Sequence, residues 1–388
     1  MKPLETFLNA KPLYYDVIDY DRMPRIYARI KSLFSLPKII HIVGTNAKGS
    51  SGRYLALALH RLGFDTGHYS SPHILKFNER IWRQNSNASD HALENAHQWL
   101  LSYLDKEDAE ALSYFEYTTL LAMRVFEGCD YVVLEAGLGG EHDATNVFEK
   151  VVSLFTPIDY DHQAFLGDSI EAIATTKMRS MAAVALCARQ PHAKSYEVCN
   201  TVATQRGARV YDVEKMLEPA HHEAIMELVQ RQHLPKYMSD NIGNAWAALM
   251  LLGFEAKASL FDATPLFGRM TPLRENIFLD VGHNPLAAQA IVGHFKDQKI
   301  RLVYNTYADK DYAAILTILK PIVACVEIIA IESQRREALE VLKERLDALE
   351  MKYEAHLTCK DEHTYLVFGS FSVAEAFLAL HPELKPHL

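Results

Sequence analysis

Short apolar runs alternate with longer amphipathic runs along this chain from about residue 38 onward. The short runs, many rich in β-branched residues, predict strands over residues 38–43, 131–135, 151–156, 277–281, 301–305, 327–331 and 365–368. The longer runs carry apolar residues at a spacing of three and four and predict helices over residues 51–62, 115–126, 170–181, 241–252, 285–295 and 337–349. Such alternation is typical of βαβ units, so we predict an α/β fold with largely parallel sheets.

The clearest break in this pattern lies at residues 261–275, where two prolines, one glycine and little periodicity precede a new strand. We therefore expect an N-terminal domain over residues 1–262, a hinge linker over residues 263–275 and a smaller C-terminal α/β domain over residues 276–388. Residues 188–236 carry the least readable pattern of the chain.

The composition excludes several classes of protein. The 388 residues suffice for two or three domains, each with its own hydrophobic core. No apolar run is long enough for a signal peptide or a membrane span, which predicts a cytoplasmic protein with no membrane partner. The five cysteines form no C-x-x-C pair, so we expect reduced thiols and neither a disulfide framework nor a zinc knuckle. The net charge of −9 argues against nucleic-acid binding but permits a phosphate ligand held by a few cations.

The strongest local motif is GTNAKGSS at residues 44–51, between a predicted strand and a predicted helix. A glycine-rich turn at the end of a strand points backbone N–H groups toward an anion, and the helix N-terminus adds partial positive charge. Lys48 would reach the phosphates, and the hydroxyl of Ser50 or Ser51 would bind Mg²⁺. The motif departs from the strict G-x-x-x-x-G-K-[ST] order because Lys48 precedes Gly49, and an ordinary glycine turn is the alternative interpretation.

Two further polar residues follow predicted strands. Glu135 ends the strand 131–135, and His162 comes shortly after the strand 151–156. Because ligands bind at the carboxyl ends of parallel strands, both side chains should share an edge with the phosphate loop. A carboxylate suits Mg²⁺, whereas histidine is a less usual ligand for so hard an ion. A loop or capping role is the alternative for Glu135.

The sequence DVGHNP at residues 280–285 has a similar arrangement in the predicted C-terminal domain. Asp280 and His283 stand where a strand ends, a position suited to acid–base chemistry or to orienting a ligand. Asn284 precedes a proline at the first helical position and is equally well explained as a helix N-cap. The remaining histidines have no companion at the spacing of metal ligands, which favours structural roles for them.

A set of motifs occurs in one order along nearly the whole chain: GTNAKGS, SSPHILKFNERI, FEYTTLLAMRVF, VLEAGLGGEHDATNV, IDYDHQAFLGDSIEAIATTK, GRM, LDVGHNP, ADKDYAAI and FGSF. In this order the chain resembles the folylpolyglutamate synthase/dihydrofolate synthase family of ATP-dependent amide ligases, relatives of the Mur cell-wall ligases. GTNAKGS alone would indicate only the wider Mur-type group, whereas SPHILKFNERI and GLGGEHDATN point to the folate branch.

The resemblance implies a Mur-ligase-like P-loop ATPase domain with a folate pocket, followed by a Rossmann-like glutamate-ligase domain. It implies ATP-dependent addition of L-glutamate to dihydropteroate, a tetrahydrofolate or both, through an acyl phosphate, in folate biosynthesis. ATP and two Mg²⁺ ions would be the cofactors, with a monovalent cation as a further candidate. The protein would be a monomer that binds only small molecules.

The resemblance also assigns roles to individual residues. The ATP cradle would comprise Gly44, Thr45, Asn46, Lys48 and Gly49, with further nucleotide contacts from Asn241, Arg269 and Asp280. The Mg²⁺ ligands would be Ser50, Glu135, His162 and Lys177. The acceptor substrate would contact Pro72, His73, Phe115 and Asp143, and glutamate would contact His283 and Ser370. The catalytic residues would be Lys177, His162 and His283.

Lys177 stands where the family places a carbamylated lysine that bridges toward the second Mg²⁺. An ammonium beside two Mg²⁺ ions would be repelled, so a lysine there should lose its proton, and CO₂ addition would convert it into an anionic oxygen ligand. A surface lysine on a polar helix is the alternative. The chain departs from the family pattern at three places. Residues 178–180 read Met-Arg-Ser where Ala-Gly-Ile is usual. Glu141 stands where relatives often have a basic residue, and Ala47 stands where they often have a glycine.

Two other functions are compatible with the nucleotide motif. A Mur-type ligase acting on a peptidoglycan precursor would share it, although SPHILKFNERI and FEYTT argue against that substrate. A nucleotide-binding protein that has lost ligase activity is the second alternative, suggested by the changed residues after Lys177.

Overall fold

The structure is a computed structural model that describes residues 3–11, 19–263, 266–356 and 358–386. The chain divides into two compact units: Met1–Ile225 with Asp240–Ala263 form the first, and Met226–Ser239 with Thr264–Leu388 form the second. Two residues of the expected hinge linker, Thr264 and Pro265, lie outside the described residues. The stretch that follows them holds a strand of the second unit, β9 (Thr271–Arg274).

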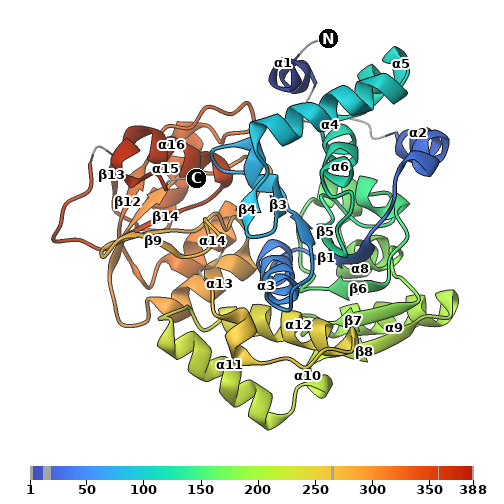
Figure 1. Cartoon of the computed structure of the whole chain (residues 1–388). Helices are drawn as coiled ribbons and strands as arrows, with labels where there is room; N and C mark the ends of the chain where they lie inside the picture. Colours follow the sequence, from blue (N-terminus) through green and yellow to red (C-terminus); the bar gives the residue numbers. More distant parts are fainter. Residues whose placement is uncertain (1–2, 12–18, 264–265, 357, 387–388) are drawn as a thin grey trace. The chain divides into compact units, whose positions relative to one another are not determined.

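A mixed sheet is the framework of the first unit (Figure 1). Among the described residues its strands follow the order β4-β3-β2-β5-β1-β6-β7-β8, with antiparallel pairing only at β2–β3 and β3–β4. Their bounds are β1 (Lys38–Val43), β2 (Thr66–Tyr69), β3 (Ile81–Arg83), β4 (Ser86–Asn87), β5 (Tyr131–Glu135), β6 (Val152–Phe155), β7 (Val184–Cys187) and β8 (Arg209–Asp212). Because β1 lies between β5 and β6, the loop after β1 starts near the middle of the sheet's carboxyl edge.

Helices cover both faces of this sheet. Successive side chains of a strand point to opposite faces of the sheet. Ile39 and Val43 of β1 lie on one face and pack into the cores under α2, α4, α6, α8 and α9. Ile42 lies on the opposite face and meets α3. The helices are α1 (Leu4–Asn9), α2 (Arg22–Ile30), α3 (Lys48–Arg61), α4 (Asp90–Tyr103), α5 (Lys106–Ala111), α6 (Tyr114–Val125), α7 (Gln163–Leu166), α8 (Ile170–Met178), α9 (Ala193–Arg206), α10 (Val213–Met216), α11 (Pro219–Arg231) and α12 (Met238–Leu251). Helices α11 and α12 each pass from one unit to the other.

The second unit is built on a sheet with the strand order β13-β12-β11-β14-β10-β9 among the described residues, in which only β9 and β10 pair antiparallel. Its other strands are β10 (Ile277–Leu279), β11 (Ile300–Tyr304), β12 (Val323–Ile328), β13 (Tyr353–Ala355) and β14 (Tyr365–Phe368). Its helices are α13 (Pro285–His294), α14 (Tyr312–Leu319), α15 (Leu339–Ala348) and α16 (Phe371–Leu380). Short 3₁₀ helices in the two units span Lys31–Leu33, Phe77–Arg80, Ala144–Val147, Ala258–Phe261 and Pro382–Leu384.

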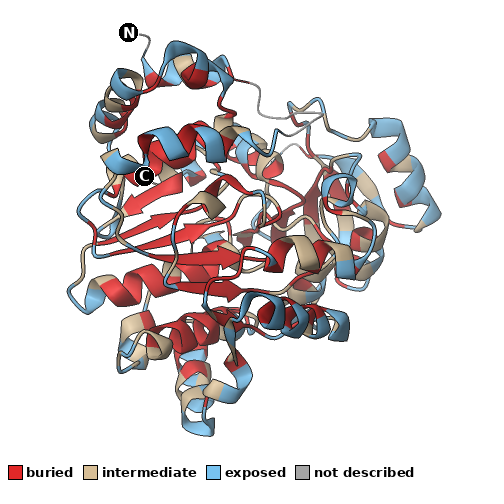
Figure 2. Cartoon of the chain, turned by 90° about the vertical axis from the view of Figure 1, so that its right-hand side faces the viewer, coloured by how far each residue is buried: buried red, intermediate tan, exposed pale blue. Residues whose placement is uncertain are grey.

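The predicted α/β fold with parallel-dominated sheets is confirmed, and strands 38–43, 131–135 and 365–368 have the predicted bounds. Most strand residues are buried, while the helices carry exposed outer faces (Figure 2). The predicted strand 327–331 has the wrong bounds, because the observed strand β12 spans Val323–Ile328. Its first three residues are not fully buried. Buried apolar residues also continue past its end, at Ile329 and Ile331, which made the predicted strand too long there. Among the described residues, no helix is both long and apolar enough to cross a membrane.

Candidate active site

Strand β1 runs into the loop 44–47 and then into α3, as the phosphate-loop motif predicts. A Cβ atom on Gly44 would lie 2.0 Å from Oγ1 of Thr156, so the loop can pass this point only with glycine. Ala47 has a φ of +69°, in the left-handed region that favours glycine. This backbone conformation explains why the family often has glycine where this chain has Ala47.

Thr45 ties the loop to the segment that follows β6. Its Oγ1 donates to the carbonyl oxygen of Asp159 (3.0 Å) and accepts from the N–H of the same residue (3.1 Å). The N–H groups of Thr45 and Asn46 both donate to the carbonyl oxygen of Pro157, at 2.9 and 3.2 Å. The donors that helix geometry offers to a phosphate are therefore the N–H groups of the first turn of α3, residues 48–50.

Lys48 and Glu135 meet beside this first turn. The Lys48 ammonium lies 3.9 Å from Oε1 of Glu135 and donates to the carbonyl oxygen of Thr45 at 3.1 Å. Glu135 is the buried last residue of β5, and its Oε2 accepts a hydrogen bond from the N–H of Ser71 at 3.3 Å. Strands β1 and β5 are neighbours, so the sheet brings a cation and a carboxylate to one edge.

Lys177 reaches the same loop from the last turn of α8. Its side chain is buried, and Nζ donates to the carbonyl oxygen of Gly44 at 3.1 Å, which excludes the surface position considered as an alternative. Burial lowers the pKa of Lys177 to about 7, with a further lowering from the Lys48 ammonium that nearby carboxylates partly offset. A Cβ atom on Gly140 would lie 2.4 Å from the carbonyl oxygen of Lys177, so the GLGG segment packs directly on this helix end.

His162 lies at the N-cap of α7 with a φ of +53°. Its backbone N–H donates to Oδ1 of Asp161 at 2.9 Å, and its ring Nε2 is 3.7 Å from Oδ2 of the same carboxylate. That carboxylate also raises the pKa of Lys177 and so lies in the electrostatic neighbourhood of the phosphate loop. Asp161 is therefore a further candidate residue of this site, next to His162.

The oxygen donors of this group fit a Mg²⁺ ion. Glu135 supplies a buried carboxylate, and Ser50 supplies a hydroxyl from the first turn of α3. Both are hard oxygen ligands of the kind that Mg²⁺ prefers. The Lys48 ammonium already balances the negative charge of the Glu135 carboxylate. A divalent cation bound to this carboxylate would balance the same charge.

Asn241 and Asn244 lie one turn apart on the part of α12 that belongs to the first unit, and both are buried. The side-chain N–H of Asn244 donates to Oγ of Ser51 at 3.2 Å, which attaches α12 to the phosphate-loop helix. We predicted Asn241 but not Asn244. The spacing of three residues, which places both on one helix face, was the signal available in the sequence.

Pro72 and His73 follow the Ser71 amide that contacts Glu135, so they lie next to the phosphate site. Pro72 is exposed. His73 Nδ1 accepts a hydrogen bond from Nε of Arg80 at 2.8 Å, and burial together with the Arg80 charge lowers the pKa of His73 to about 4. The imidazole is therefore neutral near pH 7, and Arg80 fixes its orientation.

Phe115 and Asp143 both shape the loop after β5. The Phe115 ring packs on the backbone of Gly137, where a Cβ atom would lie 2.6 Å from Cζ of the ring. Oδ2 of Asp143 accepts from the N–H groups of Gly137 (2.9 Å) and Leu138 (2.8 Å), while Oδ1 accepts from that of Thr145 (2.9 Å). The Asp143 carboxylate is thus engaged by the loop backbone, and its expected contact with the acceptor substrate stays a prediction.

In the second unit, Asp280 lies just after β10 and is buried. Its Oδ1 accepts from the N–H of Gly282 (2.8 Å), and its Oδ2 accepts from the N–H of Met270 (2.9 Å) and the hydroxyl of Tyr237 (3.2 Å). Burial raises the pKa of Asp280, and the charge of Arg269 opposes that rise. Asp280 therefore holds the turn that carries Arg269, and its expected contact with the nucleotide stays a prediction.

Arg269 and His283 lie near the carboxyl ends of the parallel strands β10 and β14. The guanidinium carbon of Arg269 is 5.6 Å from the ring centre of Phe371, the first residue of α16. The ring Nδ1 of His283 is 3.1 Å from the carbonyl oxygen of Val281. The second unit thus gathers a guanidinium and an imidazole at one edge of its sheet.

Two helices that start at this edge are capped by side chains. Oδ1 of Asn284 accepts from the N–H of Ala287 at 2.9 Å and caps α13, which confirms the capping interpretation. Oγ of Ser370 accepts from the N–H of Val373 at 3.2 Å and caps α16. The expected glutamate-binding residue Ser370 therefore has a structural contact of its own.

Comparison with known proteins agrees with this arrangement of motifs. The chain is 30% identical to the dihydrofolate synthase/folylpolyglutamate synthase of Escherichia coli (strain K12) over 403 residues, which cover 95% of this chain and 93% of that protein. The chain belongs to the dihydrofolate synthase/folylpolyglutamate synthase family. The resemblance inferred from the motifs is thereby confirmed.

Solved structures of this family share the fold. The crystal structure of Helicobacter pylori folylpolyglutamate synthetase is 38% identical, with a TM-score of 0.80 and 98% of each chain covered. A bifunctional folylpolyglutamate synthase/dihydrofolate synthase with Mn, AMPPNP and L-glutamate bound is 26% identical, with a TM-score of 0.80 and 98% of each chain covered. No protein-family model matches the chain.

Proposed function

We propose that this family member is an ATP-dependent amide ligase that joins L-glutamate to dihydropteroate, a tetrahydrofolate or both. The observation that carries the proposal is the convergence of Lys48, Glu135 and Lys177 on one glycine loop at the carboxyl edge of the first sheet. Phosphoryl transfer requires mainly the positioning of phosphates and the neutralisation of their charge, and this group of residues suits both tasks.

ATP binds in this proposal at residues 44–50. The first-turn N–H groups of α3 and the ammonium of Lys48 hold the phosphates, while Asn241 and Arg269 contact the rest of the nucleotide. The acceptor binds near Pro72, His73 and the loop on which Phe115 packs. Asp143 contributes by keeping that loop in shape.

Ser50, Glu135, His162 and a carbamylated Lys177 would hold the Mg²⁺ ions, of which we propose two. Bound there, Mg²⁺ supplies positive charge that neutralises the phosphate oxygens. The relative crystallised with Mn, AMPPNP and L-glutamate supports this choice of nucleotide, divalent metal and amino acid.

Carbamylation of Lys177 needs the neutral amine. The amine nitrogen forms a bond to the carbon of CO₂ and releases one proton to solvent, which leaves an anionic carbamate. Because burial lowers the pKa of Lys177 to about 7, the neutral amine is available near neutral pH.

The chemical order follows from leaving groups. The acceptor carboxylate attacks the γ-phosphate of ATP, which yields an acyl phosphate and ADP. The neutral amine of L-glutamate then attacks the acyl carbon and displaces phosphate, a far better leaving group than a carboxylate oxygen. His283 orients that amine, and Ser370 positions the start of α16, against which Arg269 packs.

The proposal extends to the cellular setting. A chain with a net charge of −9 has little overall attraction for nucleic acid, and small anionic substrates require only local cations such as Lys48 and Arg269. We therefore propose a cytoplasmic monomer with small-molecule substrates and with neither nucleic acid nor a membrane as a partner.

A substrate panel tests the activity. The purified protein is mixed with ATP, Mg²⁺ and L-glutamate, and dihydropteroate, tetrahydrofolate or a UDP-muramyl peptide is added as the acceptor. ADP release is measured and products are identified by mass spectrometry. We expect glutamate-dependent ADP release and a glutamylated product with at least one of the two pterin acceptors.

A matched pair of variants ties that activity to the site. Glu135→Gln should lose most of the activity because it removes the buried carboxylate, whereas Glu141→Gln, which changes a partly exposed carboxylate on the following loop, should retain it. Turnover of the muramyl peptide alone would replace the folate proposal by a Mur-type ligase. ATP binding without any glutamate-dependent ADP release would favour a protein that has lost ligation.

A further inference from the structure

A cluster of two imidazoles and one thiol lies in the second unit, on residues with no role in the proposed ligase reaction. His356 directly follows β13, Cys359 lies three residues further on, and His381 follows the last residue of α16. One ligand atom from each residue lies within 4.8 Å of the other two. The H-x-x-C spacing of His356 and Cys359 escaped the sequence analysis, and only the fold brings His381 to it.

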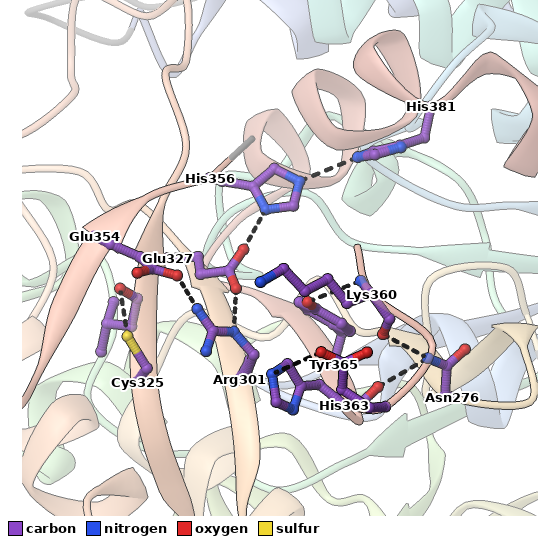
Figure 3. Close-up of polar contacts among 12 residues, drawn as sticks. Asn276, Arg301, Cys325, Glu327, Glu354, His356, Lys360, His363, Tyr365 and His381 are labelled. Atoms are coloured by element: carbon purple, nitrogen blue, oxygen red, sulfur yellow. Dashed lines mark hydrogen bonds and ion pairs between the residues drawn. The ribbon is translucent and has the colours of Figure 1, made fainter. Parts of the chain in front are cut away.

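The two imidazoles point their Nε2 atoms at each other. These nitrogens are 3.1 Å apart, and both histidine residues are buried (Figure 3). A tetrahedral zinc ion with Zn–N bonds of about 2.0–2.1 Å would place two ligand nitrogens about 3.3 Å apart. The observed separation therefore needs only a small adjustment to admit the ion.

A carboxylate lies on the Nδ1 side of each imidazole. Nδ1 of His356 lies 2.6 Å from Oε2 of Glu327, a buried residue of β12 that also pairs with Arg301. Nδ1 of His381 lies 3.6 Å from Oε1 of Glu383. Metal-ligating histidines commonly donate the other ring N–H to a carboxylate, which leaves the Nε2 lone pair for the metal.

We infer that His356, Cys359 and His381 form a binding site for a zinc-class divalent ion, distinct from the Mg²⁺ site proposed for catalysis. When the ion binds, the Cys359 thiol loses its proton to solvent and its sulfur forms a metal–sulfur bond. Three protein ligands leave a fourth position for water. Nitrogen and thiolate ligands favour zinc over Mg²⁺, which prefers oxygen.

The ion would join two parts of the second unit that are distant in sequence. It attaches the segment after β13 to the end of α16, the helix that begins at Phe371 beside Arg269. The site therefore stabilises a helix whose other end belongs to the proposed glutamate side.

Cobalt substitution of the full-length protein tests the site. Metal-stripped protein is titrated with Co²⁺ in excess Mg²⁺, which keeps Co²⁺ from the oxygen-rich site. We expect about one equivalent of Co²⁺ to produce a thiolate-to-cobalt charge-transfer band and the intense visible bands of tetrahedral cobalt. Zn²⁺ should abolish these bands by displacement, and it should raise the temperature of thermal unfolding.

Variants distinguish this site from general metal uptake. Cys359→Ser should lose the charge-transfer band, and His381→Gln should weaken Co²⁺ binding at least tenfold. Cys325→Ser, which removes a partly buried thiol of β12, and His363→Gln should leave both unchanged. Circular dichroism of each variant checks that the fold is retained. A wild-type protein without the band, or a band that survives in Cys359→Ser, would overturn the inference.

Discussion

At the scale of single residues, backbone geometry limits which side chains the phosphate loop accepts. Gly44 has no room for a Cβ atom, because Thr156 occupies that space. Ala47 has room but adopts a left-handed conformation, which costs a non-glycine residue about 1–2 kcal/mol. The two positions therefore explain, for different reasons, why glycine suits this loop.

Gly44→Ala should disrupt the loop. The added methyl group must displace Thr156 or the loop backbone, and misplacing a reacting group by about 1 Å can reduce a rate about a hundredfold. We expect a loss of this order in glutamate-dependent ADP release, measured at saturating substrates. Gly293→Ala, in α13 with no neighbouring atom within 4 Å of the new Cβ, is the matched control and should keep full activity.

Lys177 should take up CO₂ at its side-chain nitrogen. The neutral amine is accessible because burial lowers the pKa of Lys177 to about 7. We expect a carbamate signal in the ¹³C NMR spectrum of protein incubated with ¹³C-bicarbonate, and its loss in Lys177→Arg.

Lys150→Arg is the control for that experiment. Lys150 is a partly buried lysine of the first unit, and burial lowers its pKa to about 8. Retention of the signal in this variant would assign it to Lys177. Persistence of the signal in Lys177→Arg would refute the carbamate at this position.

At the scale of elements, the carboxyl edges of both sheets are where helices start, and side chains cap several of these starts. Asn284 and Ser370 each accept a backbone N–H at the first turn of a helix in the second unit. Their sequence context left a functional role open for both. A residue that caps a helix at a ligand-binding edge can both cap the helix and contact a ligand. Its side chain lies among the first-turn N–H groups, which are also the groups that bind an anionic ligand.

Two substitutions of Ser370 separate helix capping from glutamate binding. Ser370→Ala should lower the free energy of unfolding by about 1 kcal/mol through loss of the cap, measured by urea denaturation. Ser370→Asp should keep the cap but raise the KM for L-glutamate, because its carboxylate repels the substrate's carboxylates.

Ser89→Asp provides the control, since Ser89 caps α4 in the first unit through the N–H of Ala92. It should leave the KM for L-glutamate unchanged. An unchanged KM in Ser370→Asp as well would mean that Ser370 acts only as a helix cap.

The elements themselves were largely predictable from local patterns. Strand 131–135 and strand 365–368 have the predicted bounds because buried parallel strands are continuous apolar runs. Strand β2 (Thr66–Tyr69) escaped prediction because its sequence TGHY has no apolar run, although all four residues are buried. Gly67 there lies against Phe126, a contact that no local pattern reveals.

At the scale of the whole molecule, contacts between distant segments determine stability. Lys11 donates to the carbonyl oxygens of Ala109 (2.7 Å) and Leu112 (2.6 Å), about a hundred residues further along the chain. Its ammonium also lies 4.7 Å from the ring centre of Phe7. Burial lowers the pKa of Lys11 to about 8 from its usual 10.5, an effect that Glu116 partly opposes.

This pKa shift predicts a pH-dependent stability. Between about pH 8 and 10.5 the unfolded chain binds more protons at Lys11 than the folded chain, so the free energy of unfolding should gain a contribution that rises with pH. Lys11→Met should remove this rise, as measured by urea denaturation at several pH values. Lys106→Met, at an exposed lysine of α5, controls for the loss of a positive charge. Parallel curves for wild type and Lys11→Met would contradict the prediction.

The sequence by itself determined the fold class, the phosphate loop and the family, because each depends on residue patterns that span a few positions. Only the tertiary structure decided which distant side chains meet. Lys177 reaches Gly44 because β6 and α8 return the chain to the edge beside β1. Oδ2 of Asp143 accepts from the N–H of Leu138 in its own loop, Oδ2 of Asp280 accepts from the N–H of Met270 before β9, and His381 meets His356 and Cys359 at the end of α16. Strand order and loop geometry decide such contacts, and local periodicity carries no information about either.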